Sequence, residues 1–372
     1  MTVPAPFVPP PYPYERLDRF KPYGDAFEGG LIDLSIGTPF DAPPAAVTEA
    51  LSTSNTERSY PPSIGTPDLR RAVHRWMGRR FDIDVSPDHV AAAVGTKEFV
   101  GTLPQWMKLR SPERDTVLYP EIAYPTYEMG AILAGCRAVP VPMAPDGGIQ
   151  LDRIEPDDIR RALLLWVNSP ANPSGVLDDL GAAAEWGREH GVPVFSDECY
   201  VEFTWDDRGR TILEHGLDGV VAVHSLSKRS NLAGARLGFY AGDPGLVEYL
   251  REVRKHVGMM VPGPVQAAGV VALDDDEHVA VQRERYLQRL RTTARVLGAW
   301  RGAPIPLPGG GFYLWFRVDD PWGFTERLAR EAGALVSPGE FYGDAGRDFV
   351  RVAVVQPDER IELVADRLGV DH

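Results

Sequence analysis

The sequence predicts an α/β fold in which helices flank a mostly parallel sheet and a smaller α+β unit follows. From about residue 85 to residue 270, short apolar runs end at polar residues or glycines, and helical stretches separate them. Strands that alternate with helices in this way are typical of a parallel sheet. A long charged helix over about 276–300 precedes two further apolar runs, at 312–316 and 349–355, which indicate the smaller unit.

Before the sheet region, the first fourteen residues include six prolines and predict an extended arm that lies on a surface. A helix is expected to begin after Thr66, where a hydroxyl cap precedes Pro67 and apolar residues follow at helical spacing. We expect three parts, namely an arm that also contributes to a small domain, a large domain and a small C-terminal domain, at residues 1–30, 31–270 and 271–372.

Five apolar runs are expected to be strands of one sheet: residues 90–94, 117–119, 163–167, 192–195 and 220–224. Ligands bind beyond the carboxyl ends of the strands in open α/β sheets, so the segments after these runs predict one site. The polar residues and glycines in those segments are Gly95, Thr96, Lys97, Tyr124, Asn172, Asp197, Tyr200, Ser225, Ser227 and Lys228.

Composition narrows the classes of partner. Of 372 residues, 53 are acidic and 39 are basic, which gives a net charge of −14 and argues against nucleic acid as the main partner. The basic residues divide into 34 arginines and five lysines, so anionic small molecules can still bind where arginines gather. The two cysteines, Cys136 and Cys199, have neither disulfide nor metal spacing, and no metal is expected. Since no secretory signal and no long apolar stretch occur, we expect a cytoplasmic protein without membrane contact.

The segment after the fifth run has the residues that a covalently bound aldehyde cofactor needs. Lys228 follows the expected strand, two serines lie beside it, and Arg236 follows eight residues later. A lysine can form a Schiff base with an aldehyde while an arginine binds a phosphate, and pyridoxal 5'-phosphate requires both. Most lysines are solvated surface residues, but the small residues and glycines around Lys228 argue against that interpretation here.

Two further strand ends suit the same cofactor. Asp197 can pair with a protonated pyridine nitrogen, while Tyr200 and Asn172 can reach the phenolic oxygen of the ring. Taken alone, Asp197 would more often be a turn residue, and the Asn-Pro dipeptide at Asn172 is first of all a turn signal.

The segment Gly95-Thr96-Lys97 lies between a strand and an expected helix, where free backbone amides bind phosphate. Lys97 is a rival candidate for the Schiff base and ranks below Lys228, since it lacks the serine and arginine companions. Tyr124 can stack on a flat ring, although a packed core aromatic is an equally good interpretation.

Taken together, these motifs resemble the class I/II aminotransferases of fold type I. They are Gly-Thr-Lys, Tyr-Pro-x-Tyr, Asn-Pro-x-Gly, Ser-Asp-Glu-x-Tyr, Ser-x-Ser-Lys and Gly-x-Arg-x-Gly, in the order expected of that family. The resemblance runs from Asp33 to Arg351 and implies a seven-stranded sheet. It is closest to the N-succinyldiaminopimelate aminotransferases of actinobacteria, on the stretches 60–67 and 254–262.

The resemblance implies a role for each candidate residue. Lys228 would bind the cofactor covalently and carry the proton between substrate and cofactor, Asp197 would hold the pyridinium and Tyr124 the ring face. The groups expected at the phenolic oxygen are Tyr200 and Asn172. Those expected at the phosphate are Thr96, Ser225, Ser227 and Arg236, joined by Tyr60 from the second subunit of a homodimer, and Gly95 and Lys97 are also expected to bind the cofactor. Those expected at the substrate α-carboxylate are Arg351, Asn172 and Gly37.

The implied reaction is ping-pong transfer of an amino group from glutamate to a keto acid. N-succinyl-2-amino-6-ketopimelate, an intermediate of diaminopimelate and lysine biosynthesis, is the preferred acceptor. Acceptors related to aspartate, alanine or aromatic amino acids remain alternatives, as does a cysteine-S-conjugate β-lyase. A metabolite-sensing transcription regulator is disfavoured because the proline-rich residues before Leu31 do not suit a DNA-binding domain. Arg58, Arg229 and Arg254 are candidates for the distal part of the substrate, and spacing does not select among them.

Overall fold

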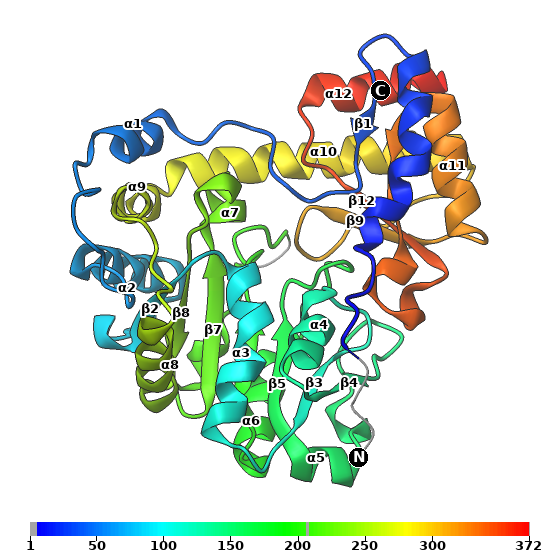
Figure 1. The fold of residues 1–372 in the computed structure, drawn as a ribbon. Helices are drawn as coiled ribbons and strands as arrows, with labels where there is room; N and C mark the ends of the chain where they lie inside the picture. Colours follow the sequence, from blue (N-terminus) through cyan, green and yellow to red (C-terminus); the bar gives the residue numbers. More distant parts are fainter. Residues whose placement is uncertain (1–5, 206–207, 372) are drawn as a thin grey trace.

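The computed structural model describes residues 6–205 and 208–371. In this part of the chain, seven strands form one sheet in the order β2-β8-β7-β6-β5-β3-β4 (Figure 1). Their bounds are β2 Val90–Ala93, β3 Thr116–Pro120, β4 Arg137–Val141, β5 Ala162–Asn168, β6 Val194–Asp197, β7 Val220–Ser225 and β8 Gly238–Gly242. All neighbours run parallel except at β8, which is antiparallel to β2 and β7. The predicted fold class is therefore confirmed.

All five apolar runs expected to be strands form strands of this sheet, namely β2, β3, β5, β6 and β7. The two strands without a predicted run have weaker patterns. β4 lies at the sheet edge, where only Val141 is buried, and it contains Pro140, which an edge strand tolerates because one side needs no donor. β8 begins and ends at glycine.

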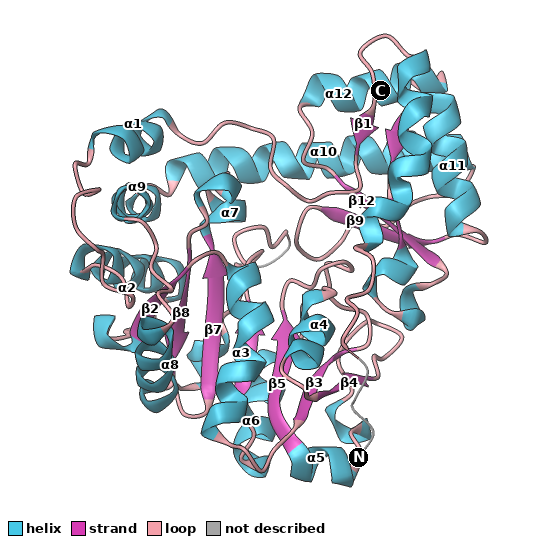
Figure 2. Cartoon of the chain, viewed as in Figure 1, coloured by secondary structure: helices cyan, strands magenta, loops and turns pink. Residues whose placement is uncertain are grey.

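Helices cover both faces of the sheet (Figure 2). Their bounds are α1 Ala45–Thr53, α2 Pro67–Phe81, α3 Thr96–Arg110, α4 Thr126–Leu133, α5 Pro156–Arg161, α6 Leu180–His190, α7 Leu226–Arg229, α8 Pro244–His256 and α9 Gly263–Asp274. Single turns of 3-10 helix are η2 Pro87–His89, η3 Leu151–Arg153, η4 Ile212–His215, η5 Ala233–Ala235, η6 Gly339–Tyr342 and η7 Asp344–Gly346. As predicted, the Thr66 hydroxyl caps α2 by accepting a hydrogen bond from the Leu69 amide at 3.3 Å.

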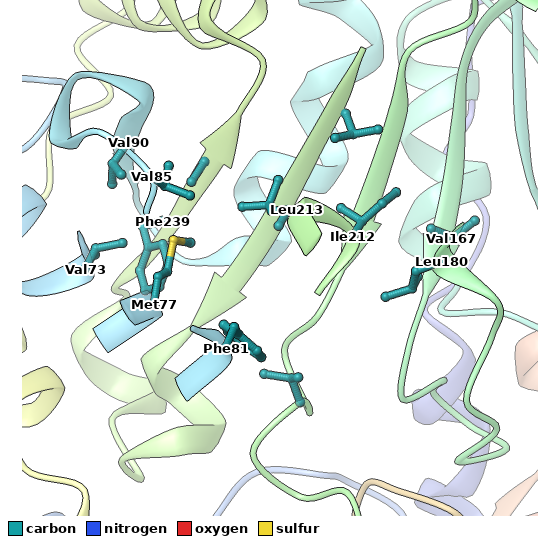
Figure 3. Packing of buried hydrophobic residues seen from close by; sticks show 14 of the residues in the cluster. Val73, Met77, Phe81, Val85, Val90, Val167, Leu180, Ile212, Leu213 and Phe239 are labelled. Atoms are coloured by element: carbon teal, nitrogen blue, oxygen red, sulfur yellow. The ribbon is translucent and has the colours of Figure 1, made fainter. Parts of the chain in front are cut away.

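Side chains of the strands alternate between two apolar clusters, one on each face. On one face, α2, α6 and α9 pack against residues such as Ala92 and Phe239. Figure 3 shows Val73, Met77 and Phe81 of α2 on this side. On the other face, α3, α4 and α8 pack against neighbours such as Ala91. Burial on both faces fixes the sheet in the middle of a three-layer unit, with its carboxyl edge free for a site.

A smaller α+β unit adjoins the carboxyl edge of the sheet, as the sequence predicts (Figure 1). Its antiparallel sheet has the order β11-β12-β9, and a parallel pair, β1-β10, lies beside it. The bounds are β1 Ile32–Asp33, β9 Tyr313–Arg317, β10 Ala334–Leu335, β11 Ser337–Pro338, β12 Phe349–Ala353, α10 Glu277–Arg301, α11 Pro321–Ala332 and α12 Asp358–Leu368. The division at residues 30 and 270 stays a prediction.

The extended arm predicted for residues 1–14 has no regular structure over residues 6–12, whereas Pro13 and Tyr14 already belong to a 3-10 helix, whose first position tolerates proline, and residues 1–5 lie outside the described part. It continues into η1, the 3-10 helix Pro13–Ala26, which buries Leu17 and Phe20 in the cluster that contains Ala329 of α11. Within the described residues, no helix combines the length and apolar character needed to cross a membrane.

Candidate active site

A cavity of about 260 Å³ lies at the carboxyl ends of β5, β6 and β7 and is closed on its far side by β9 and β12. It gathers most of the residues that the sequence singles out. Those lining it are Gly37, Thr96, Lys97, Tyr124, Asn172, Asp197, Tyr200, Ser225, Ser227, Lys228, Arg236 and Arg351. Two predicted residues do not line it: Gly95 lies directly behind Arg236, and Tyr60 is 95% exposed.

Lys228 is carried by α7, a four-residue helix that begins directly after β7. The Ser225 hydroxyl caps this helix by accepting a hydrogen bond from the backbone N–H of Ser227 at 3.1 Å. The Lys228 side chain crosses the cavity, and its Nζ donates to the carbonyl oxygen of Gly37. The Lys228 amine therefore lies between the large sheet and the segment that precedes α1.

Burial is the main cause that lowers the pKa of Lys228, to about 8. Arg351 and Arg236 act in the same direction, while Cys199 and Asp197 oppose it. A lysine with such a pKa is partly neutral at physiological pH, as a nucleophile and proton carrier must be.

This pKa predicts a pH dependence of stability in the cofactor-free protein. Between pH 8 and the ordinary lysine value of 10.5, the unfolded chain binds a proton at Lys228 that the folded chain has lost. Stability therefore rises with pH across this window, because the unfolded state binds more protons there. We expect the free energy of unfolding of the wild type, measured relative to Lys228→Met by chemical denaturation, to increase from pH 8 to 10.5. A constant difference across that window would contradict the low pKa.

Asp197 ends β6 and is 7% exposed. Its Oδ2 accepts a hydrogen bond from the Tyr127 hydroxyl at 2.9 Å, and its Oδ1 accepts one from the Cys199 amide at 3.2 Å. Burial raises the pKa of this carboxyl group. Within the described residues it forms no ion pair, so this buried carboxylate fits a cationic partner such as a protonated pyridine nitrogen.

An anion site lies at the start of α3. Gly95 has a φ of 75°, and a Cβ there would lie 2.2 Å from Nη2 of Arg236, so only glycine fits. The free N–H groups of a fifteen-residue helix face the cavity beside the Thr96 hydroxyl. The Arg236 guanidinium donates to the Ala233 carbonyl at 2.9 Å, and no carboxylate of the described chain pairs with it. This cradle fits a phosphate.

A second anion site is formed by Arg351 on β12, which is 2% exposed. Its Nη1 donates to Oδ1 of Asn172 at 2.8 Å, and its Nη2 donates to the Tyr14 hydroxyl at 3.2 Å. The guanidinium carbon lies 4.1 Å from the ring centre of Tyr313 and 4.7 Å from that of Tyr342. Among described residues, no carboxylate pairs with this buried cation. An arginine packed against two aromatic rings is suited to bidentate binding of a carboxylate from the cavity.

Four tyrosines that are not among the predicted site residues, namely Tyr12, Tyr14, Tyr127 and Tyr313, lie at the cavity or hold a residue that lines it. The Tyr200 hydroxyl lies 2.9 Å from that of Tyr313, and Tyr127 holds Asp197. Tyr12 and Tyr14 of the proline-rich arm line the cavity as well. Tyr127 could have been found from the sequence, because it ends the Tyr-Pro-Thr-Tyr segment that begins at Tyr124. The arm and Tyr313 reach the site only through tertiary packing, which no local pattern shows.

The three arginines considered for the distal part of the substrate lie outside the cavity. Arg229 is 4% exposed and pairs with Glu202, at 2.9 Å. Arg254 is 1% exposed and donates to both carboxylate oxygens of Glu98, at 2.8 and 2.7 Å. For these two the suggestion is wrong, because each is already bound to a carboxylate of its own chain. Arg58 is on the surface.

Comparison with known proteins agrees with this geometry. Residues 30–368 match the family model of aminotransferase class I and II. The chain is 42% identical over 369 residues to the 4-dedimethylamino-4-oxo-anhydrotetracycline transaminase OxyQ of Streptomyces rimosus, covering 96% of this chain and 99% of that one. It is 34% identical to the LL-diaminopimelate aminotransferase of Aquifex aeolicus, covering 97% and 96%. A solved structure from Thermus thermophilus, described as a probable N-succinyldiaminopimelate aminotransferase, superimposes with a TM-score of 0.85 at 32% identity, covering 95% and 98%. The chain belongs to the class I and II aminotransferases, which use pyridoxal 5'-phosphate.

Proposed function

We propose that this aminotransferase moves an amino group from glutamate to N-succinyl-2-amino-6-ketopimelate. The observation that carries the proposal is the convergence of Lys228, Asp197 and Arg351 on one cavity. When bound, pyridoxal 5'-phosphate supplies an aldehyde for the amino group and an electron sink for the Cα–H bond. The three side chains supply the nucleophile, the charge at the ring nitrogen and the carboxylate clamp that this chemistry needs.

The residues that line the cavity would divide the work of proton transfer and cofactor binding among them. Lys228 would take the Cα proton of the amino donor on Nζ and pass it to the aldehyde carbon of the cofactor, and carry it the opposite way for the keto acid, which its low pKa permits. Tyr124 would cover the ring face, and Tyr200 and Asn172 would donate to the phenolic oxygen. The cofactor phosphate would be held by the α3 N-terminus from Gly95 to Lys97, by Ser225, Ser227 and Arg236, and by Tyr60 of a second copy of this chain. That last contact makes the proposed enzyme a homodimer, and the exposure of Tyr60 is consistent with it.

The substrate α-carboxylate would bind Arg351 from the cavity side. Asn172 and the Tyr14 hydroxyl now hold the guanidinium in the plane that a carboxylate needs. Gly37 also lines the cavity, and a Cβ there would lie 1.9 Å from the Tyr313 hydroxyl. Glycine at this position therefore keeps the backbone close to where the carboxylate would sit.

The charges around the cavity favour an acidic acceptor. Four cations line it, namely Lys97, Lys228, Arg236 and Arg351, against the single carboxylate of Asp197. The phosphate and the α-carboxylate engage the two arginines, and Lys228 is the reacting group. The exposed ammonium of Lys97 then remains, 3.4 Å from the Tyr12 hydroxyl, for a carboxylate at the far end of the substrate.

A comparison of amino acceptors tests the substrate. With glutamate as donor, we expect kcat/KM for N-succinyl-2-amino-6-ketopimelate to exceed that for pyruvate or phenylpyruvate by at least about tenfold, or about 1.4 kcal/mol. The relationship to OxyQ makes 4-dedimethylamino-4-oxo-anhydrotetracycline the second acceptor to include. A higher kcat/KM for that compound, or for a monocarboxylic keto acid, would overturn the succinylated substrate. If the succinylated acceptor is preferred, the enzyme belongs to diaminopimelate and lysine biosynthesis, and we propose that it acts in the cytoplasm.

A further inference from the structure

The helix that carries Lys228 is too short to be stable by itself. It spans only Leu226–Arg229, and a single helical turn gains too few hydrogen bonds to repay the ordering of its backbone. Its position must therefore come from contacts with the rest of the protein. Arg229, the residue after Lys228, points away from the cavity and supplies most of the polar contacts, with 4% of its surface exposed.

Arg229 uses its whole guanidinium group. Its Nε donates to Oε1 of Glu202 at 2.9 Å, and its Nη2 donates to Oδ1 of Asp276 at 2.8 Å. Its Nη1 donates to the Ala272 carbonyl, and to the Ser230 hydroxyl at 3.3 Å. These bonds fix the end of α7 against α9 and the start of α10.

Glu202 lies in the turn that follows β6, five residues after Asp197. Besides Arg229 it accepts hydrogen bonds from Nε1 of Trp76 at 2.9 Å and from Nε of Arg80 at 2.8 Å. Burial opposes ionisation of this carboxyl group, but Arg229 and Arg80 outweigh it and lower its pKa. Glu202 is therefore an ionised group that joins the segment of Asp197 to the segment of Lys228.

Stability alone does not account for this pair. Removing two charges from water costs several kcal/mol per ion, and well-packed apolar side chains in the same volume are often equally stable. What an apolar pair cannot supply is the fixed direction of several charged hydrogen bonds.

We propose that Arg229 and Glu202 form a positioning pair, which sets the place of the Lys228 amine relative to the Asp197 carboxylate. The inference rests on the proposed function, in which these two groups act on opposite sides of one cofactor ring. Neither Arg229 nor Glu202 lines the cavity, so both act through their neighbours in sequence.

The test uses the holoenzyme of Arg229→Met, Glu202→Gln and Arg229→Lys. For each variant, the visible absorbance of the bound cofactor is titrated with pH in the absence of substrate, and the midpoint of that titration is compared with the midpoint of the wild type. The groups acting on Lys228, which are Asp197, Cys199, Arg236 and Arg351, are unchanged in all variants. We expect the midpoint to move by about half a pH unit or more in the first two variants. Arg229→Lys should restore it in part, because lysine keeps the charge but not the fork of donors.

Arg289→Met is the matched control. Arg289 is also 4% exposed and also binds two carboxylates, Asp41 at 2.6 Å and Asp358 at 2.5 Å, but none of its hydrogen-bond or ion-pair partners in the described chain lines the cavity. Its loss should lower the thermal midpoint while the absorbance midpoint stays that of the wild type. The same result in Arg229→Met and Glu202→Gln would overturn the proposal and leave the pair a structural one. Should Arg229→Met fail to fold, Glu202→Gln and Arg229→Lys decide the question by the same readout. Because no acceptor is present, an error in the proposed substrate cannot produce either result.

Discussion

Replacing Lys228 by alanine is expected to abolish the visible absorbance of the bound cofactor and to lower the rate of amino transfer by roughly 10⁴-fold. Lys228 is the lysine whose Nζ reaches across the cavity, toward Gly37, and whose pKa is lowered to about 8. The variant lacks both the nucleophile for the cofactor aldehyde and the group that moves the Cα proton. Steady-state assays with glutamate and an absorption spectrum of the purified variant measure the two losses.

Lys97→Ala is the matched control, because Lys97 is the other lysine that lines the cavity. Its ammonium is turned toward the arm, 4.9 Å from the ring centre of Tyr12. The visible absorbance should therefore survive in Lys97→Ala. Normal turnover in Lys228→Ala, or loss of the absorbance in Lys97→Ala alone, would move the covalent role to Lys97.

Arg351→Met is expected to lower kcat/KM by about 10² to 10³, both for glutamate and for the keto acid, or about 3–4 kcal/mol. Both substrates carry an α-carboxylate. Arg351 is a buried cation that lines the same cavity as Lys228, and we place the α-carboxylate against it. Methionine nearly fills the volume between the rings of Tyr313 and Tyr342 but donates no hydrogen bond. Rapid mixing of the variant with each substrate measures the two half-reactions separately.

The kcat/KM of Arg351→Lys should lie between that of the wild type and that of Arg351→Met. An ammonium keeps the charge but cannot bind both carboxylate oxygens from one plane. The visible absorbance should remain in both variants, because Arg351 is placed at the substrate and not at the cofactor. Unchanged kcat/KM in Arg351→Met would show that this arginine is not the carboxylate clamp. Loss in only one half-reaction would contradict a site shared by both substrates.

The central strands could be predicted because each combines an apolar run with a polar end. β5 is buried along its whole length and ends at Asn168, and β6 ends at Asp197. β4 and β8 lack such runs. β4 is an edge strand with partly exposed residues, and β8 begins and ends at glycine, so it has few large apolar side chains. A continuous run of large apolar side chains, as in β5, is typical of a strand covered on both faces, and neither β4 nor β8 has one.

Most of the cavity residues that the sequence singles out lie within a few residues of a strand end, so local sequence places them near one another. Tyr313 and the arm residue Tyr14 reach the cavity from the smaller unit and the N-terminus, and no spacing in the sequence shows that they meet Tyr200 and Arg351. The sequence likewise shows no sign that Arg254 is buried and already paired, and therefore unable to bind the substrate. Its bidentate pairing with Glu98 joins residues 156 positions apart.

Amino transfer through a cofactor bound at Lys228 can be followed in the absorption spectrum of the purified enzyme. We expect a visible band that fades on addition of glutamate alone and returns when a keto acid is added, since the amino group is left on the cofactor between the two steps. A protein without a visible band, or with a band that glutamate leaves unchanged, would rule out this mechanism.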